Sequence, residues 1–224
     1  NMKRTLYYLL AVFTVLCAVS CNDDEKELSS LTGIWNYTRP HFEFEYAADS
    51  IVIEMYQGRK MAVATEEVKE IFLRMATVKM QDYFQGIEVI SANRMNITAK
   101  MQTAQPFKIG ADYDQTTEFI EVSLDKKDMQ QLVGEKADMI PAVSFRYTLQ
   151  NETLTMYFDE AYVRTIYAMM ENRIVPMIVD NMGIDFEHMP EGVRQQVTEG
   201  VKKQIPLILE KIISLKIGFV LTKA

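Results

Sequence analysis

The chain is poor in the two side chains that most often carry catalysis or bind transition metals. Its 224 residues include two cysteines, Cys17 and Cys21, and two histidines, His41 and His188. The histidines are far apart and show no metal-binding spacing, and no Gly-x-Ser-x-Gly context offers a nucleophile. Thiol catalysis, a redox pair, a cysteine-ligated zinc and a histidine metal centre therefore lack the residues they need.

Glycine-rich phosphate loops are missing as well. The nine glycines are scattered, and they form neither a Gly-x-Gly-x-x-Gly fingerprint nor a Walker pattern. Carboxylates are plentiful, but they fall on expected helix faces and turns, so that no glycosidase-like pair stands out. We therefore expect a protein that is not an enzyme, with no cofactor and no metal.

What is present first is a leader. Lys3 and Arg4 precede an apolar run over residues 6–19, and small residues lead to Cys21. A cationic start, a short apolar stretch and a small-residue cleavage site are the three parts of a secretory signal peptide. A transmembrane helix needs about 20 apolar residues, so a membrane span is the weaker interpretation. We expect residues 1–20 to be removed.

The sequence Ala18-Val19-Ser20-Cys21 is similar to a relaxed bacterial lipobox, and with the acids at 23–25 it resembles lipoproteins of Bacteroidota. The resemblance implies cleavage between Ser20 and Cys21 and acylation of Cys21. Several acyl chains give stable anchoring. It implies residues 21–30 as a lipidated tether at the outer membrane, on the periplasmic face or the cell surface. The acidic residues 23–25 are either part of a signal that exports the protein to the cell surface or solvated residues of the tether.

The charge balance limits the partners. Removal of Lys3 and Arg4 leaves 22 Lys and Arg against 31 Asp and Glu, a net charge of −9 in place of −7. Contacts with phosphate need a basic surface, so this balance argues against nucleic acid or anionic lipid as the main partner. The membrane contact that we expect runs through Cys21.

Residues 31–224 are predicted to form one domain, large enough to bury a core. Period-two patterns predict a hairpin over 33–55 and a meander of strands over 87–159, whereas a spacing of three to four residues predicts a helix over 65–86. Two helices are expected over 160–213, kinked at Pro176 and Pro206. A last strand over 215–221 then pairs with the first strand and closes a barrel.

The start of this domain, Gly33-Ile34-Trp35, resembles the opening of lipocalin-like (calycin) domains. The resemblance implies a mainly β fold with helical insertions (α+β), built on an antiparallel up-and-down barrel of about eight strands. Here one helix is expected after the second strand and two before the closing strand. Gly33 and Trp35 would seal one end of the barrel, with Arg164 or Lys223 packed on the indole.

Two functions fit such a barrel. The first is binding of a small apolar or amphipathic ligand, since a barrel of about eight strands can enclose one. Methionines are concentrated in the expected helices and are either adaptable lining or core filler; they are Met169, Met170, Met177, Met182 and Met189. The alternative is an envelope interaction or scaffold protein with a filled barrel, for which Tyr37, Tyr46 and Tyr56 are surface anchors. The sequence leaves the ligand and the oligomeric state open.

Overall fold

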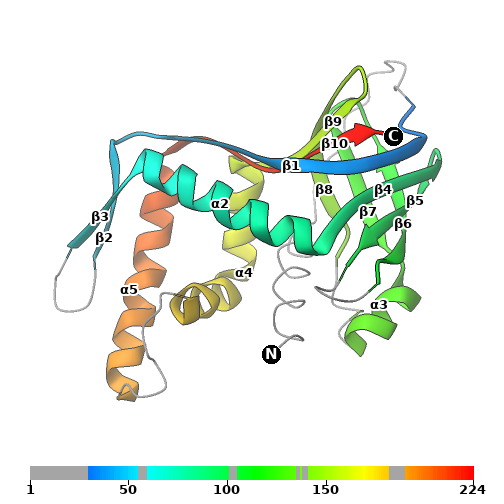
Figure 1. Ribbon diagram of the computed structural model, residues 1–224. Coiled ribbons are helices and arrows are strands. Elements are labelled where there is room, and N and C mark those ends of the chain that lie inside the picture. The colour runs from blue at the N-terminus through cyan, green and yellow to red at the C-terminus, as the bar shows by residue number, and fades with distance from the viewer. Residues whose placement is uncertain (1–29, 55–59, 101–104, 135–136, 138–140, 182–189) are drawn as a thin grey trace. The chain divides into compact units, whose positions relative to one another are not determined.

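The computed structural model describes residues 30–54, 60–100, 105–134, 137, 141–181 and 190–224 (Figure 1). These residues form two compact units. The barrel unit comprises the described residues up to Phe42, Leu73–Phe158 and Lys216–Ala224, and the second unit comprises Glu43–Phe72 and Asp159–Leu215. The range 31–224, which the sequence presents as one domain, is thus divided between two units.

The barrel unit contains a closed, antiparallel, eight-stranded barrel in which each strand pairs with two neighbours. The first strand lies between the fourth and the last, so the closure predicted from the sequence is confirmed. The fold is mainly β with helical parts and is compatible with a lipocalin-like barrel. Its strands, in chain order, are β1 (Gly33–Tyr46), β4 (Phe84–Ser91), β5 (Arg94–Ala99), β6 (Phe107–Gln115), β7 (Phe119–Leu124), β8 (Val143–Gln150), β9 (Thr153–Asp159) and β10 (Ile212–Lys223).

Alternation of side chains explains why these segments form barrel strands. Along β6, Ile109, Ala111 and Tyr113 are buried. Asp112 and Asp114, which alternate with Tyr113, are exposed. Successive side chains of a strand point to opposite faces, so one face fills the interior and the other meets water.

The up-and-down order gives the barrel two distinct ends. The β4–β5, β6–β7 and β8–β9 turns lie at one end, together with the start of β1 and the end of β10. We call it the Trp35 end. The β5–β6 and β7–β8 connections lie at the other, which we call the α3 end after the helix α3 (Lys126–Val133).

Helix α3 was missed in the sequence, where residues 87–159 read as strands throughout. It begins at Asp125, whose carboxylate accepts a hydrogen bond from the Lys127 amide at 2.9 Å, and it ends at Gly134 with φ +66°. Helices of this length, only eight residues, give too little periodicity to stand out among strands. The Asp N-cap was the available signal.

The start of the domain also differs from the expected hairpin. Strand β1 runs without interruption to Tyr46, and the hairpin is made instead by β2 (Ser50–Glu54) and β3 (Lys60–Ala64), a separate two-stranded sheet. Helix α2 (Thr65–Tyr83) follows at once, three residues shorter than predicted and after the third strand. The threonine that opens it donates its backbone amide to the Asp49 carbonyl at 3.0 Å.

The second unit has its own apolar core. Helices α4 (Glu160–Asn181) and α5 (Glu191–Glu210) pack together through Tyr167, Val175 and Val201, with further aliphatic side chains around them. The backbone of α4 leaves helical geometry at Met170, six residues before Pro176, whereas α5 continues through Pro206. The predicted kink is therefore displaced in α4.

None of the helices within the described ranges combines the length and the apolar character that a bilayer crossing requires.

Candidate functional site: the barrel interior

The interior of the barrel is the site on which both functional hypotheses depend. It contains a cavity of about 20 Å³. Pockets for drug-sized ligands measure about 300–1,000 Å³, whereas about 10–15 Å³ is enough for one water. Every residue lining this cavity is apolar; they are Phe84, Ile87, Met95, Ile97, Val122, Leu124, Val143, Phe145, Met156 and Phe219.

Aromatic rings occupy much of the space around this cavity. The ring of Phe219 lies 4.8 Å from that of Phe84 and 5.7 Å from that of Phe145, centroid to centroid. Phe145 in turn stacks on Phe158 at 4.4 Å. These separations are those of favourable aromatic pairs. Rings contributed by β4, β8, β9 and β10 thus meet in one cluster inside the barrel.

Trp35 lies inside the barrel at the end where β1 begins, which we named the Trp35 end. Its side chain is 1% exposed, and the indole Nε1 donates a hydrogen bond to the Leu31 carbonyl at 2.7 Å. The Lys223 ammonium lies 5.6 Å from the ring centroid, within reach of a cation–π contact. Arg164, the other cation considered, donates to the Ile212 carbonyl instead.

Gly33 makes this arrangement possible. It has φ +133°, a region that residues with a Cβ rarely adopt, and a Cβ built there would lie 3.1 Å from Cε of Lys223. A glycine two residues before the indole lets the chain turn into β1 beside the lysine stem.

Helix α3 covers the opposite end. Met129 is 1% exposed and packs in a cluster with Ile109 and Ala137. Ile97 and Leu124 contact this cluster and also line the cavity. The apolar face of α3 therefore continues the barrel core beyond the rim of the strands.

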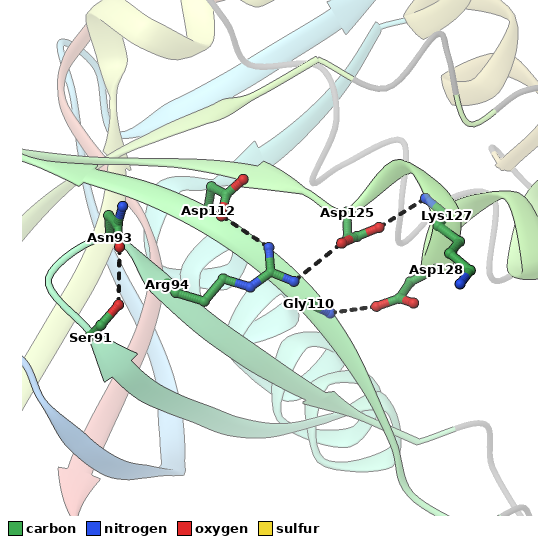
Figure 2. A network of polar contacts seen from close by, with 8 residues as sticks. All are labelled: Ser91, Asn93, Arg94, Gly110, Asp112, Asp125, Lys127 and Asp128. Atoms are coloured by element: carbon green, nitrogen blue, oxygen red, sulfur yellow. Dashed lines mark hydrogen bonds and ion pairs between the residues drawn. The ribbon is translucent and has the colours of Figure 1, made fainter.

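A polar network holds the start of α3 to the barrel wall (Figure 2). The guanidinium of Arg94 pairs with Asp112 at 3.0 Å and with Asp125, the α3 N-cap, at 3.2 Å. Asp128 accepts a hydrogen bond from the Gly110 amide at 2.8 Å. A Cβ at Gly110 would lie 2.4 Å from Nη2 of Arg94, so a side chain there would displace the guanidinium from its present position. This network could not be predicted from the sequence, because its members come from three separate segments, β5, β6 and the start of α3.

The charge of Asp125 contributes to stability. Its hydrogen bond with Arg94, followed by that with the Lys127 amide, holds the pKa of Asp125 below its ordinary value. A lowered carboxyl pKa stabilises the fold above the unfolded pKa, about 3.9, and this contribution is lost as pH falls through the folded pKa.

We therefore expect Asp125→Asn, which keeps a good N-cap, to lower the urea midpoint at neutral pH, because the Arg94 pair is lost. The difference from the natural chain should shrink as pH falls below the unfolded pKa, about 3.9, and disappear below the lowered pKa of the folded state. Asp114→Asn, at an exposed aspartate of β6, is the control and should change little at either pH. A loss for Asp125→Asn that is the same at both pH values would contradict the charge contribution.

Tyr37 departs from its predicted role as a surface anchor. Its hydroxyl is buried, and it has no hydrogen-bond partner among the described residues. Burial raises the pKa of Tyr37 to about 12. The ring lies edge-on to Phe84 at 5.7 Å, so Tyr37 belongs to the aromatic filling.

The remaining predicted residues fall in several places. Ser20 and Cys21 lie outside the described residues, as do Tyr56, Met182, Met189 and His188. Met169 is 63% exposed on α4, and the ring of His41 lies 5.6 Å from that of Tyr157. Within the described ranges, no three His, Cys, Asp or Glu side chains are grouped so that they could hold a metal ion.

Comparison of the chain with protein-family models, with curated proteins and with solved structures finds no match. The lipocalin-like character of the chain therefore depends on the closed eight-stranded barrel.

Proposed function

We propose that the protein is a lipid-anchored, non-enzymatic envelope lipoprotein whose barrel is a filled scaffold. The observation that carries this proposal is the small interior cavity, about 20 Å³, surrounded by packed aromatic rings. A water-sized apolar space offers no room for a ligand of ordinary size. A filled barrel is suited to presenting its outer surface to a partner.

The anchor in this proposal is Cys21. The leader that ends in Ala18-Val19-Ser20-Cys21 supports lipoprotein processing of the Bacteroidota type, with the mature protein on the periplasmic face of the outer membrane or on the cell surface. More than one acyl chain on this residue would hold the protein firmly, at about 0.8 kcal/mol for each buried CH₂.

Binding of a small apolar ligand is the competing proposal. It is favoured by the wholly apolar lining of the cavity, but it requires a space of about 300 Å³ or more. Stoichiometric uptake of a fatty acid, haem or a bile acid would support it against the filled scaffold.

Cys21→Ser tests the anchor. In a host that processes lipoproteins, the natural chain is expected in the membrane fraction with a mass increased by acyl chains. The variant should lack these chains and should move to the soluble fraction, because no other cysteine remains in the mature protein to be acylated. Cys17→Ser is the matched control and should behave like the natural chain. Membrane retention of Cys21→Ser would contradict the anchor.

A further inference from the structure

The outer wall of the barrel carries two exposed isoleucines near the place where the chain enters it. Ile34 of β1 is 51% exposed and Ile90 of β4 is 53% exposed. Ile34 pairs with Glu88, and Ile90 lies two residues further along the same face of β4. Diagonal neighbours of this kind lie about 7–8 Å apart. The two isoleucines therefore form one apolar spot at the Trp35 end.

The polar groups around this spot do not oppose contact with lipid. The carboxylate of Glu88, between the two isoleucines, forms an ion pair with Lys108 and accepts a hydrogen bond from Asn96. Lys223 lies at the same end, and the backbone amide of Ala224 donates to the Ile34 carbonyl at 2.9 Å. An apolar spot beside a cation suits the interface of a bilayer, where acyl chains lie next to phosphates.

The tether leads to the same end. The described chain starts at Ser30, four residues before Ile34. Nine residues, 22–30, separate this end from Cys21, and they can span at most about 30 Å. If Cys21 is acylated, as the proposed function has it, the Trp35 end can never be far from the membrane surface.

The distribution of charge points the same way. Residues 31–42, 73–158 and 216–224 of the barrel unit carry 12 Lys and Arg and 11 Asp and Glu. The second unit, residues 43–72 and 159–215, carries 9 Lys and Arg and 16 Asp and Glu. Its net charge is therefore −7. A nearly neutral barrel approaches a membrane without the repulsion that an acidic unit meets.

We propose that the Trp35 end of the barrel rests on the lipid bilayer through Ile34, Ile90 and Lys223. This contact would orient the barrel of the tethered protein on its membrane. The proposal depends on the lipid anchor of the proposed function.

The near absence of cysteine makes a direct test possible. Acylated Cys21 has no free thiol, and Cys17 is lost with the leader, so an introduced cysteine is the only one that a fluorophore labels. Ile34→Cys and Ile90→Cys place an environment-sensitive probe on the spot. Ser123→Cys is the control, because Ser123 is exposed on β7 next to the residue where that strand ends at the α3 end.

The labelled, lipidated proteins are reconstituted in vesicles of phosphatidylcholine with brominated acyl chains. We expect quenching at positions 34 and 90 to be several-fold stronger than at position 123. Near-UV circular dichroism of Trp35 selects variants with an intact barrel. Equal quenching at all three positions, with protein that still floats with the vesicles, would overturn the membrane contact and leave the anchor standing. Protein that does not float would overturn both.

Discussion

Trp35→Ala is expected to lower the free energy of unfolding by about 3–5 kcal/mol, the usual cost of removing a large buried aromatic side chain. The indole is 1% exposed, its Nε1 donates to the Leu31 carbonyl, and Lys223 covers its face. Its removal leaves a void at the end of the barrel and an unpaired carbonyl. Urea denaturation followed by far-UV circular dichroism measures the loss.

Ile34→Ala provides the matched control, because this neighbour points outward and is 51% exposed. A surface substitution of this kind changes stability by about 0.5 kcal/mol or less. Trp35→Phe should fall between the two. If Trp35→Ala cost no more than Ile34→Ala, the indole would not be part of the barrel core.

Phe219→Ala is expected to have a similar effect from the centre of the barrel, about 3–5 kcal/mol. Phe219 is 4% exposed, lines the cavity and contacts the rings of Phe84 and Phe145. The expected loss of stability has two parts. One is the transfer free energy lost with the removed ring, and the other is the cost of the cavity that remains, about 24 cal/mol for each Å³ that does not collapse.

The enlarged cavity should also acquire a property that the natural protein lacks. Dry apolar cavities of about 150 Å³ bind benzene or xenon, so we expect Phe219→Ala to be stabilised by benzene and the natural chain to be unaffected. Phe219→Leu, which keeps more of the apolar volume, should lose less stability and gain less binding. Stabilisation of the natural chain by benzene would show that its interior is already open.

Period-two alternation was sufficient to predict the barrel strands, because each strand has one buried and one solvent-facing side. Closure followed from the last strand, which was expected to pair with the edge of the first strand and does so while also pairing with β9. Helix α3 was not predicted, because its eight residues are held by contacts with residues distant in the sequence. Its N-cap pairs with Arg94 on β5, and Asp128 accepts a hydrogen bond from Gly110 on β6.

The interior was beyond the reach of the sequence for a different reason. Phe145 and Phe219 each fit an inward position on a predicted strand, whereas Phe84 falls within the helix predicted over 65–86 and begins β4 instead. The separations of the three rings depend on the register and tilt of their strands. The same inward pattern is compatible with a hollow barrel and with a filled one. Likewise, Tyr37 read as a surface residue because nothing in its neighbours marks its hydroxyl as buried.

The most direct measurement is the occupancy of the barrel in the mature protein carrying Cys21→Ser. The protein is extracted with organic solvent, incubated with palmitate, haem or cholate, and weighed by native mass spectrometry. Because the cavity measures about 20 Å³, we predict that the measured mass is that of the protein without ligand after incubation with each of the three probes. A one-to-one complex with any of them, lost when a bulky residue is placed in the cavity by Val122→Phe, would contradict the filled scaffold.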